Sequence, residues 1–271
     1  MKNLFSICGA FALLISCTEP INLNLNTEEN IRLAVDAEID NVQQADTFYL
    51  SITSNFFEAG GNVPATNAIV TVTVQDTVFS FIEVGGTGKY YSPPGFRGKP
   101  GFTHTLNIQY DGQLYQATSF MRQPVKIDSL TCTRLPEDDF LNPGEVRIGI
   151  SFQDPPNQRD YYWFIDYVNG ANEYSNLFEY GALFNDESID GLKVENVEYN
   201  IFDLEVGDTL TVDMRMISEL DEEIISALAT ESFRGGLFDS PPSNVPSNIS
   251  NGALGLFIAY PVSRKTIGIN K

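Results

Sequence analysis

Apolar and polar residues alternate along most of the chain from residue 31 onward. In the first such run, Leu33, Val35, Ala37 and Ile39 are apolar and the residues between them are mainly polar. A period of two is typical of β-strands that bury one face, because successive side chains point to opposite sides of a strand. The pattern recurs at 48–52, 69–74, 104–110 and 113–118. The sequence therefore predicts a mainly β protein.

Turn residues divide these runs into short strands. Asp111 and Gly112 separate two of the runs, and this pair is typical of a type I′ turn in a β-hairpin. Glycines and prolines at 85–88 and 93–101 predict loops. About seven short strands within residues 31–123 predict an N-terminal β-sandwich of the immunoglobulin-like kind.

A mixed polar segment after Pro124 marks the predicted boundary to a second domain, at 123/124. Strands are expected at 146–152, 161–168, 194–202, 209–217 and 254–262. The run Tyr161–Val168 is apolar on both faces, which predicts a central strand covered on both sides. Ser218 with Asp221 fits a capping box that begins a helix, whose apolar face holds Leu220, Ile224, Ala227 and Leu228. Residues 124–271 are therefore predicted to form a β-rich domain with one short helix.

The N-terminus has the features of an export signal. Lys2 precedes a largely apolar run, Leu4–Ile15, which is too short to span a bilayer as a mature helix. Residues 14–17, Leu-Ile-Ser-Cys, resemble the bacterial lipobox, in which cleavage leaves a lipid-modified cysteine as the first residue. We expect a signal peptide at 1–16, lipid on Cys17, and an Asn-rich, acidic tether at 17–30. A plain signal peptide cut nearby is the alternative.

The acidic excess excludes some classes of partner. The chain has 16 Lys and Arg against 36 Asp and Glu, a net charge of −20, and losing Lys2 with the signal leaves −21. Such a field repels nucleic acids and anionic lipid headgroups, so membrane attachment has to come from acyl chains. His104 is the single histidine, which leaves few arrangements for metal sites or catalytic triads.

Several segments, taken in order, resemble a known family. They are IRLAVDAEI, AIVTVTVQD, TGKYYSP, HTLNIQYDGQLYQATS, VKIDSL, LFNDESIDG, TVDMRMISELDEEIISAL and PSNVPSNISNGALGLFIAYPVSRKTI. With the lipobox, they resemble a Bacteroidota outer-membrane lipoprotein family of unknown function over nearly the whole mature chain. The resemblance implies a transthyretin-like or carboxypeptidase-regulatory-like N-terminal sandwich. It also implies genes beside those of TonB-dependent receptors, and it carries no catalytic residues.

One loop has the opening pattern of a calcium site. Asp186, Ser188, Asp190 and Gly191 match D-x-[S/N/D]-x-D-G, in which alternate oxygens converge on a hard cation. The closing position is Val197, and neither neighbouring glutamate is in register. The site residues predicted for calcium are Asp186, Ser188 and Asp190, and a structural turn before a strand is the alternative interpretation.

Aromatic and acidic residues give two further candidate sites. The strand aromatics at 161–167 are expected in the core, so the loop residues Tyr174 and Tyr180 are the predicted ligand-binding residues for sugar or peptide. The acids at 137–139 and 221–223 are numerous enough for glycosidase chemistry, but solvated surface is the favoured interpretation. A G-x-S-x-G motif is absent from the sequence, and no catalytic residue is predicted.

We therefore expect a non-enzymatic outer-membrane lipoprotein that is an accessory subunit of a β-barrel protein, such as a TonB-dependent receptor or a larger complex. Its expected role is in uptake or assembly. Glu19, close to Cys17, favours the cell surface over the periplasmic face. Two alternatives stay open: a cell-surface carbohydrate-binding or hydrolytic lipoprotein, and a surface adhesin or structural subunit. Calcium is the one cofactor with a candidate site.

Overall fold

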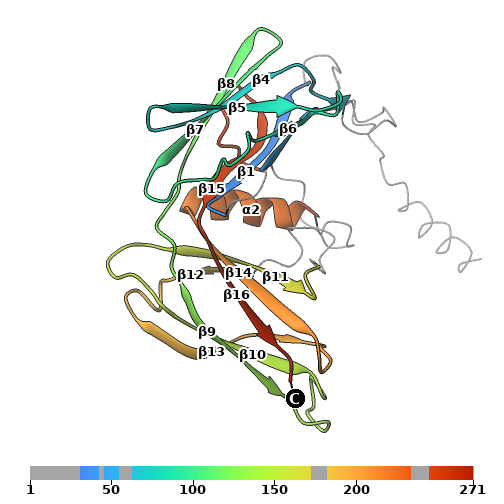
Figure 1. Cartoon of the computed structure of the whole chain (residues 1–271), viewed down its shortest axis with the longest axis vertical. Coiled ribbons are helices and arrows are strands. Elements are labelled where there is room, and N and C mark those ends of the chain that lie inside the picture. The colour runs from blue at the N-terminus through green and yellow to red at the C-terminus, as the bar shows by residue number, and fades with distance from the viewer. Residues whose placement is uncertain (1–30, 43–45, 55–62, 172–181, 233–243, 271) are drawn as a thin grey trace, which may run out of the picture. The chain divides into compact units, whose positions relative to one another are not determined.

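A computed structural model describes residues 31–42, 46–54, 63–171, 182–232 and 244–270. In this part of the chain the structure consists of strands and one helix, α2 (Glu219–Ser232), as Figure 1 shows. The prediction of a mainly β fold with one short helix is confirmed. The described helix is not long and apolar enough to cross a membrane.

The first sheet has the strand order β15-β1-β2-β6-β5-β4-β7-β8, with β3 paired to β2. Its strands are β1 (Leu33–Asp40), β2 (Thr47–Ile52), β3 (Val63–Pro64), β4 (Ile69–Val74), β5 (Thr77–Glu83), β6 (Lys89–Tyr91), β7 (Thr103–Tyr110), β8 (Gln113–Phe120) and β15 (Leu254–Tyr260). The two ends of this order meet, because the Ala259 N–H of β15 donates to Ser119 Oγ of β8 at 2.9 Å. The sheet thus folds around one apolar core, in a sandwich-like arrangement.

Local sequence accounts for much of this sheet. On β1 the four alternating apolar residues, Leu33, Val35, Ala37 and Ile39, are at most 2% exposed. Asp111 and Gly112 have φ angles of 46° and 72°, the positive values that a type I′ turn requires. The predicted hairpin is therefore confirmed, with β7 and β8 paired from Thr103 to Phe120.

Two smaller sheets enclose a second core. One has the order β13-β10-β9 and the other β12-β11-β14-β16. Their strands are β9 (Ile127–Arg134), β10 (Val146–Gln153), β11 (Tyr161–Val168), β12 (Ala182–Asn185), β13 (Lys193–Phe202), β14 (Thr209–Ile217) and β16 (Val262–Gly268). Apolar residues of both sheets face each other, among them Ile148 of β10, Phe164 of β11 and Met214 of β14.

Strand β11 is buried on both faces, as its sequence predicts. Tyr162 and Phe164 lie in the core between the two smaller sheets, whereas Trp163 and Ile165 lie in a third core on the opposite face. The third core also contains Ile224 of α2. Because β11 lies between β12 and β14, it has the central position that an all-apolar strand favours.

The start of α2 is fixed by the predicted capping box. The Asp221 N–H donates to Ser218 Oγ at 3.2 Å, and the Ser218 N–H donates to Asp221 Oδ2 at 3.0 Å. Ile224 and Ile225 are buried, and Leu228 packs against the same core. The expectation for Leu220 is wrong, since its side chain is 46% exposed and the buried face runs through Ile225 instead.

The last predicted strand, at 254–262, is two strands in two different sheets. Strand β15 ends at Tyr260 and pairs in parallel with β1, whereas β16 begins at Val262 and pairs with β14. Pro261 lies between them, and its lack of an N–H donor interrupts the ladder. The predicted domain boundary at 123/124 stays a prediction, but the first sheet includes a strand from beyond it. In Figure 1 this red strand lies beside the blue β1.

Gly255 makes the contact between β15 and β1 possible. Its φ angle is +100°, and a Cβ atom at this position would lie 1.8 Å from the carbonyl oxygen of Val35. A side chain at Gly255 would therefore be strained and would also collide with the backbone of the neighbouring strand.

We predict that Gly255→Ala lowers the free energy of unfolding by at least about 3 kcal/mol, because backbone strain and a backbone clash add together. Gly252→Ala is the matched control, since Gly252 has a φ angle of +72° with no atom within 4 Å of the added Cβ. Its expected cost is about 1 kcal/mol, from strain alone. Equal losses for the two variants in denaturant unfolding would contradict the close-approach argument.

Candidate functional site

The structure describes three of the six site residues that the sequence predicts. Cys17, Tyr174 and Tyr180 lie outside the described residues. Asp186, Ser188 and Asp190 lie in the loop 186–192, which connects β12 to β13 and therefore links the two smaller sheets.

Two residues of this loop join a third acid to form an acidic cluster. Asp154, Asp186 and Asp190 each offer a carboxylate oxygen, and these oxygens all lie within 4.8 Å of one another. Asp154 follows directly after β10, so the cluster combines residues from both sides of the sandwich edge. We name Asp154, Asp186 and Asp190 the acidic cluster. Ser188 is exposed, and the part of the chain that the structure describes shows no hydrogen bond from it to the cluster.

Asp154 is the best-anchored member of the cluster. Its side chain is fully buried, and it accepts hydrogen bonds from the Tyr162 hydroxyl at 2.5 Å and from the Gly191 N–H at 2.9 Å. Burial raises the pKa of Asp154, and the nearby charges of Asp186 and Asp190 raise it further. The sequence does not single out this residue, because Asp154 stands at a strand end before Pro155 and belongs to no spacing motif.

Asp186 is buried but incompletely paired. Its side chain is 1% exposed, its Oδ1 atom lies 4.0 Å from Arg159 Nε, and its Oδ2 atom has no hydrogen-bond partner among the described residues. Asp190 is exposed and accepts a hydrogen bond from the Asn157 N–H at 2.7 Å. The cluster therefore combines Asp154, which two hydrogen bonds hold in place, Asp186, which has one oxygen without a hydrogen-bond partner among the described residues, and Asp190, which faces solvent.

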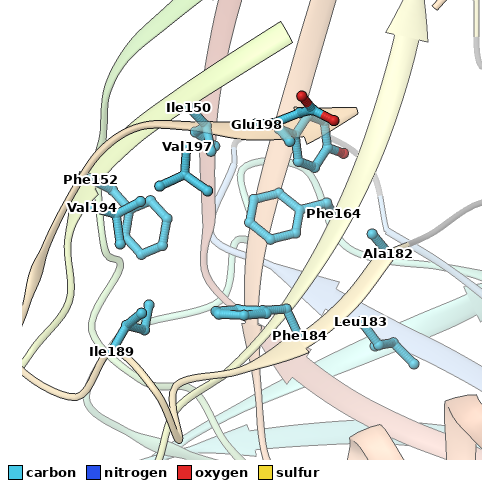
Figure 2. A pocket seen from close by; sticks show the side chains of 11 residues that line it. Ile150, Phe152, Phe164, Ala182, Leu183, Phe184, Ile189, Val194, Val197 and Glu198 are labelled. Atoms are coloured by element: carbon cyan, nitrogen blue, oxygen red, sulfur yellow. The ribbon is translucent and has the colours of Figure 1, made fainter. Parts of the chain in front are cut away.

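An apolar pocket of about 340 Å³ lies beside the cluster, between the two smaller sheets. Figure 2 shows the rings of Phe152, Phe164 and Phe184 around this hollow, with Ile189 of the loop 186–192 below Phe152. Residues from β10, β11, β12 and β13 contribute to the lining. We name this the apolar pocket. Its size and aromatic lining are typical of sites for small molecules.

A buried carboxyl group lies behind one wall of the apolar pocket. Tyr199 lines the pocket and packs on Phe164 with a ring distance of 5.0 Å. The Tyr199 hydroxyl lies 2.9 Å from both carboxylate oxygens of Asp166, which is 2% exposed. Burial, and to a lesser extent the charge of Asp213, raises the pKa of Asp166 to about 7.

A second hollow, of about 410 Å³, is lined mainly by charged and tyrosine side chains. We name it the charged cavity, and its lining includes Asp40, Asp46, Asp213, Arg215 and Tyr260. Arg215 is 7% exposed and its guanidinium lies over the rings of Trp163 and Tyr260, at 4.4 and 4.7 Å. Asp46 is also buried, and its Oδ2 atom has no hydrogen-bond partner in the described residues.

The fold and these hollows define a class: a mainly β protein whose described residues form three apolar cores and one helix. Within this class, the chain belongs to the family described as Domain of unknown function (DUF4249), whose sequence model matches residues 18–266. The prediction of a family of unknown function is confirmed. A search of curated proteins finds no match to the chain.

The charged cavity gives a pH-dependent prediction. Burial raises the pKa of Asp46 to about 8, and the neighbouring Asp40 charge raises it too. Between pH 4 and pH 8 the folded state therefore keeps a proton that the unfolded state loses, so the free energy of unfolding falls as pH rises. We expect Asp46→Asn to flatten this decline between pH 5 and pH 8 in denaturant unfolding. Asp138→Asn, at an exposed acid, is the control and should keep the wild-type slope.

Proposed function

We propose that the protein is a non-enzymatic outer-membrane lipoprotein, anchored through lipid on Cys17, that serves as an accessory subunit of a β-barrel protein. The partner is a TonB-dependent receptor or a larger outer-membrane complex, and the role is in uptake or assembly. The lipobox at residues 14–17 carries this proposal. The resemblance to Bacteroidota lipoproteins supports it, and the family match begins at residue 18, directly after Cys17.

The anchor limits where a partner can be. A segment of the length of residues 17–30 spans at most about 50 Å when fully extended. The folded body therefore stays close to the membrane surface, and its partners are proteins or molecules at that surface. We further propose that the cell surface, rather than the periplasmic face, is the side on which it acts, because Glu19 lies near Cys17.

An exposed apolar row on the first sheet supports a protein partner. Ile82 of β5 pairs with Tyr91 of β6. Ile69 of β4 and Leu114 of β8 both pair with Gln109 of β7, which lies between them. The row therefore extends from β6 across β5, β4 and β7 to β8. Val70 pairs with Phe81, which places Ile69 beside Ile82. Ile69 and Ile82 are each 62% exposed, and Leu114 is 48% exposed. The row is interrupted on β7 by the polar Gln109. Exposed apolar residues gathered on one face of a sheet are typical of interaction surfaces. We name Tyr91, Ile82, Ile69 and Leu114 the apolar row.

We predict that the protein, purified from its native cells in mild detergent, brings down a large β-barrel protein. In the variant Ile69→Asp with Ile82→Asp, the recovered barrel protein should fall at least about tenfold, because two carboxylates would have to be desolvated at the interface. Val206→Asp is the matched control, since Val206 is 65% exposed but outside the apolar row. Mass spectrometry of the eluate measures both outcomes.

The anchor is checked in the same cells. Cys17→Ser should abolish incorporation of radioactive palmitate and release the protein from the membrane fraction. Recovery of the wild-type lipoprotein alone at native abundance would overturn the accessory role. Unchanged barrel recovery in the double aspartate variant would overturn the apolar row as its contact.

A second candidate function, cell-surface ligand binding, is favoured by the apolar pocket. Its lining is aliphatic and aromatic, with Glu198 as the one carboxylate. Such a surface suits the apolar part of a small ligand better than a sugar, whose hydroxyl groups need several polar partners. The pocket thus supports a binding lipoprotein more than a hydrolytic one.

We predict that the fluorescent probe 1-anilinonaphthalene-8-sulfonate binds in the apolar pocket. Val197 lines the pocket and is 53% exposed, so Val197→Trp should fill the mouth and weaken probe binding about tenfold. Val206→Trp adds the same side chain at an exposed position that does not line the pocket, and it should bind like wild type. A fluorescence titration that shows equal affinity for both variants would place the probe elsewhere.

A further inference from the structure

We infer that the acidic cluster of Asp154, Asp186 and Asp190 binds a calcium ion. This site differs from the one that the loop motif predicts, because Asp154 from the end of β10 joins Asp186 and Asp190. The inference goes beyond the proposed function and does not depend on it.

The spacing of the three carboxylates suits one calcium ion. Their ligand oxygens all lie within 4.8 Å of one another. Calcium binds oxygen at about 2.3–2.6 Å, so two ligands on opposite sides of the ion are about 4.6–5.2 Å apart. The spacing therefore allows the three oxygens to surround one calcium ion.

The unpaired Asp186 oxygen is the independent observation that points to a cation. Asp186 is 99% buried, and its Oδ2 atom makes no hydrogen bond within the described residues. A buried carboxylate oxygen without a partner is destabilising unless a positive charge lies against it. Arg159 supplies only part of that charge, because its Nε atom is 4.0 Å from Oδ1 and its side chain is 49% exposed.

The neighbouring acid shows what complete pairing looks like in this region. Asp160 is fully buried, but Arg122 Nη1 lies 2.8 Å from its Oδ1 atom and Gln158 Nε2 donates to its Oδ2 atom at 2.9 Å. Of the three carboxylates of the acidic cluster, that of Asp186 has the one ion pair found among the described residues, with Arg159 at 4.0 Å. Near this loop, the shortage of positive charge therefore lies at the acidic cluster and not at Asp160.

The ligand atoms favour calcium over other metals. All three are carboxylate oxygens, which select hard cations, whereas zinc and copper sites use histidine or cysteine. Magnesium demands near-ideal octahedral geometry with oxygens at about 2.0–2.1 Å, so opposite ligands lie about 4.1 Å apart. A cluster whose ligand oxygens lie within 4.8 Å of one another has room for the larger ion.

A bound ion would fix the edge of the sandwich. The loop 186–192 connects β12 and β13, which belong to different sheets. Asp154 already accepts hydrogen bonds from the Gly191 N–H of this loop and from the Tyr162 hydroxyl of β11. Ile189 of the same loop lines the apolar pocket. Calcium would thus hold the loop against β10 and keep that wall of the pocket in place.

The test is calorimetric titration of CaCl₂ into the full-length, detergent-solubilised protein after removal of divalent ions with a chelator. We expect one calcium ion per chain and a higher melting temperature in calcium. Asp186→Asn should raise Kd at least tenfold, and Asp190→Asn, at an exposed position that leaves the fold intact, should do the same. Asp138→Asn removes an exposed acid outside the cluster and should bind calcium like wild type.

Three results would overturn the inference. The first is no calcium heat and no calcium-dependent melting shift in the wild-type protein. The second is wild-type calcium affinity in Asp190→Asn, which holds even if Asp186→Asn fails to fold. The third is magnesium binding at least as tight as calcium binding, which would exclude calcium as the ion of this site.

Discussion

The fold depends on strand β15, whose two faces are buried in two different cores. Phe257 and Ala259 lie in the core of the first sheet, and Ile258 and Tyr260 lie in the core that α2 covers. Because alternate side chains point to opposite sides, no position from Leu256 to Tyr260 can hold an unpaired polar residue without a large desolvation cost. Loss of this strand would expose both the edge of β1 and the apolar core that α2 covers. The two halves of the chain are therefore stabilised by the same five residues.

The charged cavity lies where this shared strand ends. The last residue of the strand, Tyr260, donates a hydrogen bond to Glu38 Oε2 of β1 at 2.5 Å. The guanidinium of Arg215 lies over the Tyr260 ring in a cation–π contact. Arg215 Nη1 is 3.5 Å from the same Glu38 oxygen. A buried arginine is stabilised here by one carboxylate and two aromatic faces, that of Tyr260 and that of Trp163. Removing Glu38 would leave a buried charge without its partner, so the cavity connects β1 and β14 electrostatically.

Local patterns predicted those parts of the fold that local interactions determine. The Asp111-Gly112 turn and the Ser218–Asp221 cap each depend on residues at most three positions apart. The central position of β11 followed from its apolar composition. The separation of β15 from β16 at Pro261 was missed, because an apolar run does not reveal which sheet each part joins. The sequence does not indicate the role of Asp154 either, because this residue is more than thirty positions away from Asp186. The packing of the two smaller sheets, which no local pattern reveals, brings the two carboxylates together.

The apolar row and the apolar pocket differ in physical character, and this difference separates the two candidate functions. The row lies on the outer face of a paired sheet, so a partner that covered it would have to be broad, as a folded protein is. The apolar pocket is a hollow of about 340 Å³ that Ile189 helps to line, so a ligand that bound there would have to be small. The two surfaces belong to different sheets and share no residue. The proposed barrel contact through the row and the proposed ligand site in the pocket therefore use separate residues, and the two functions are compatible.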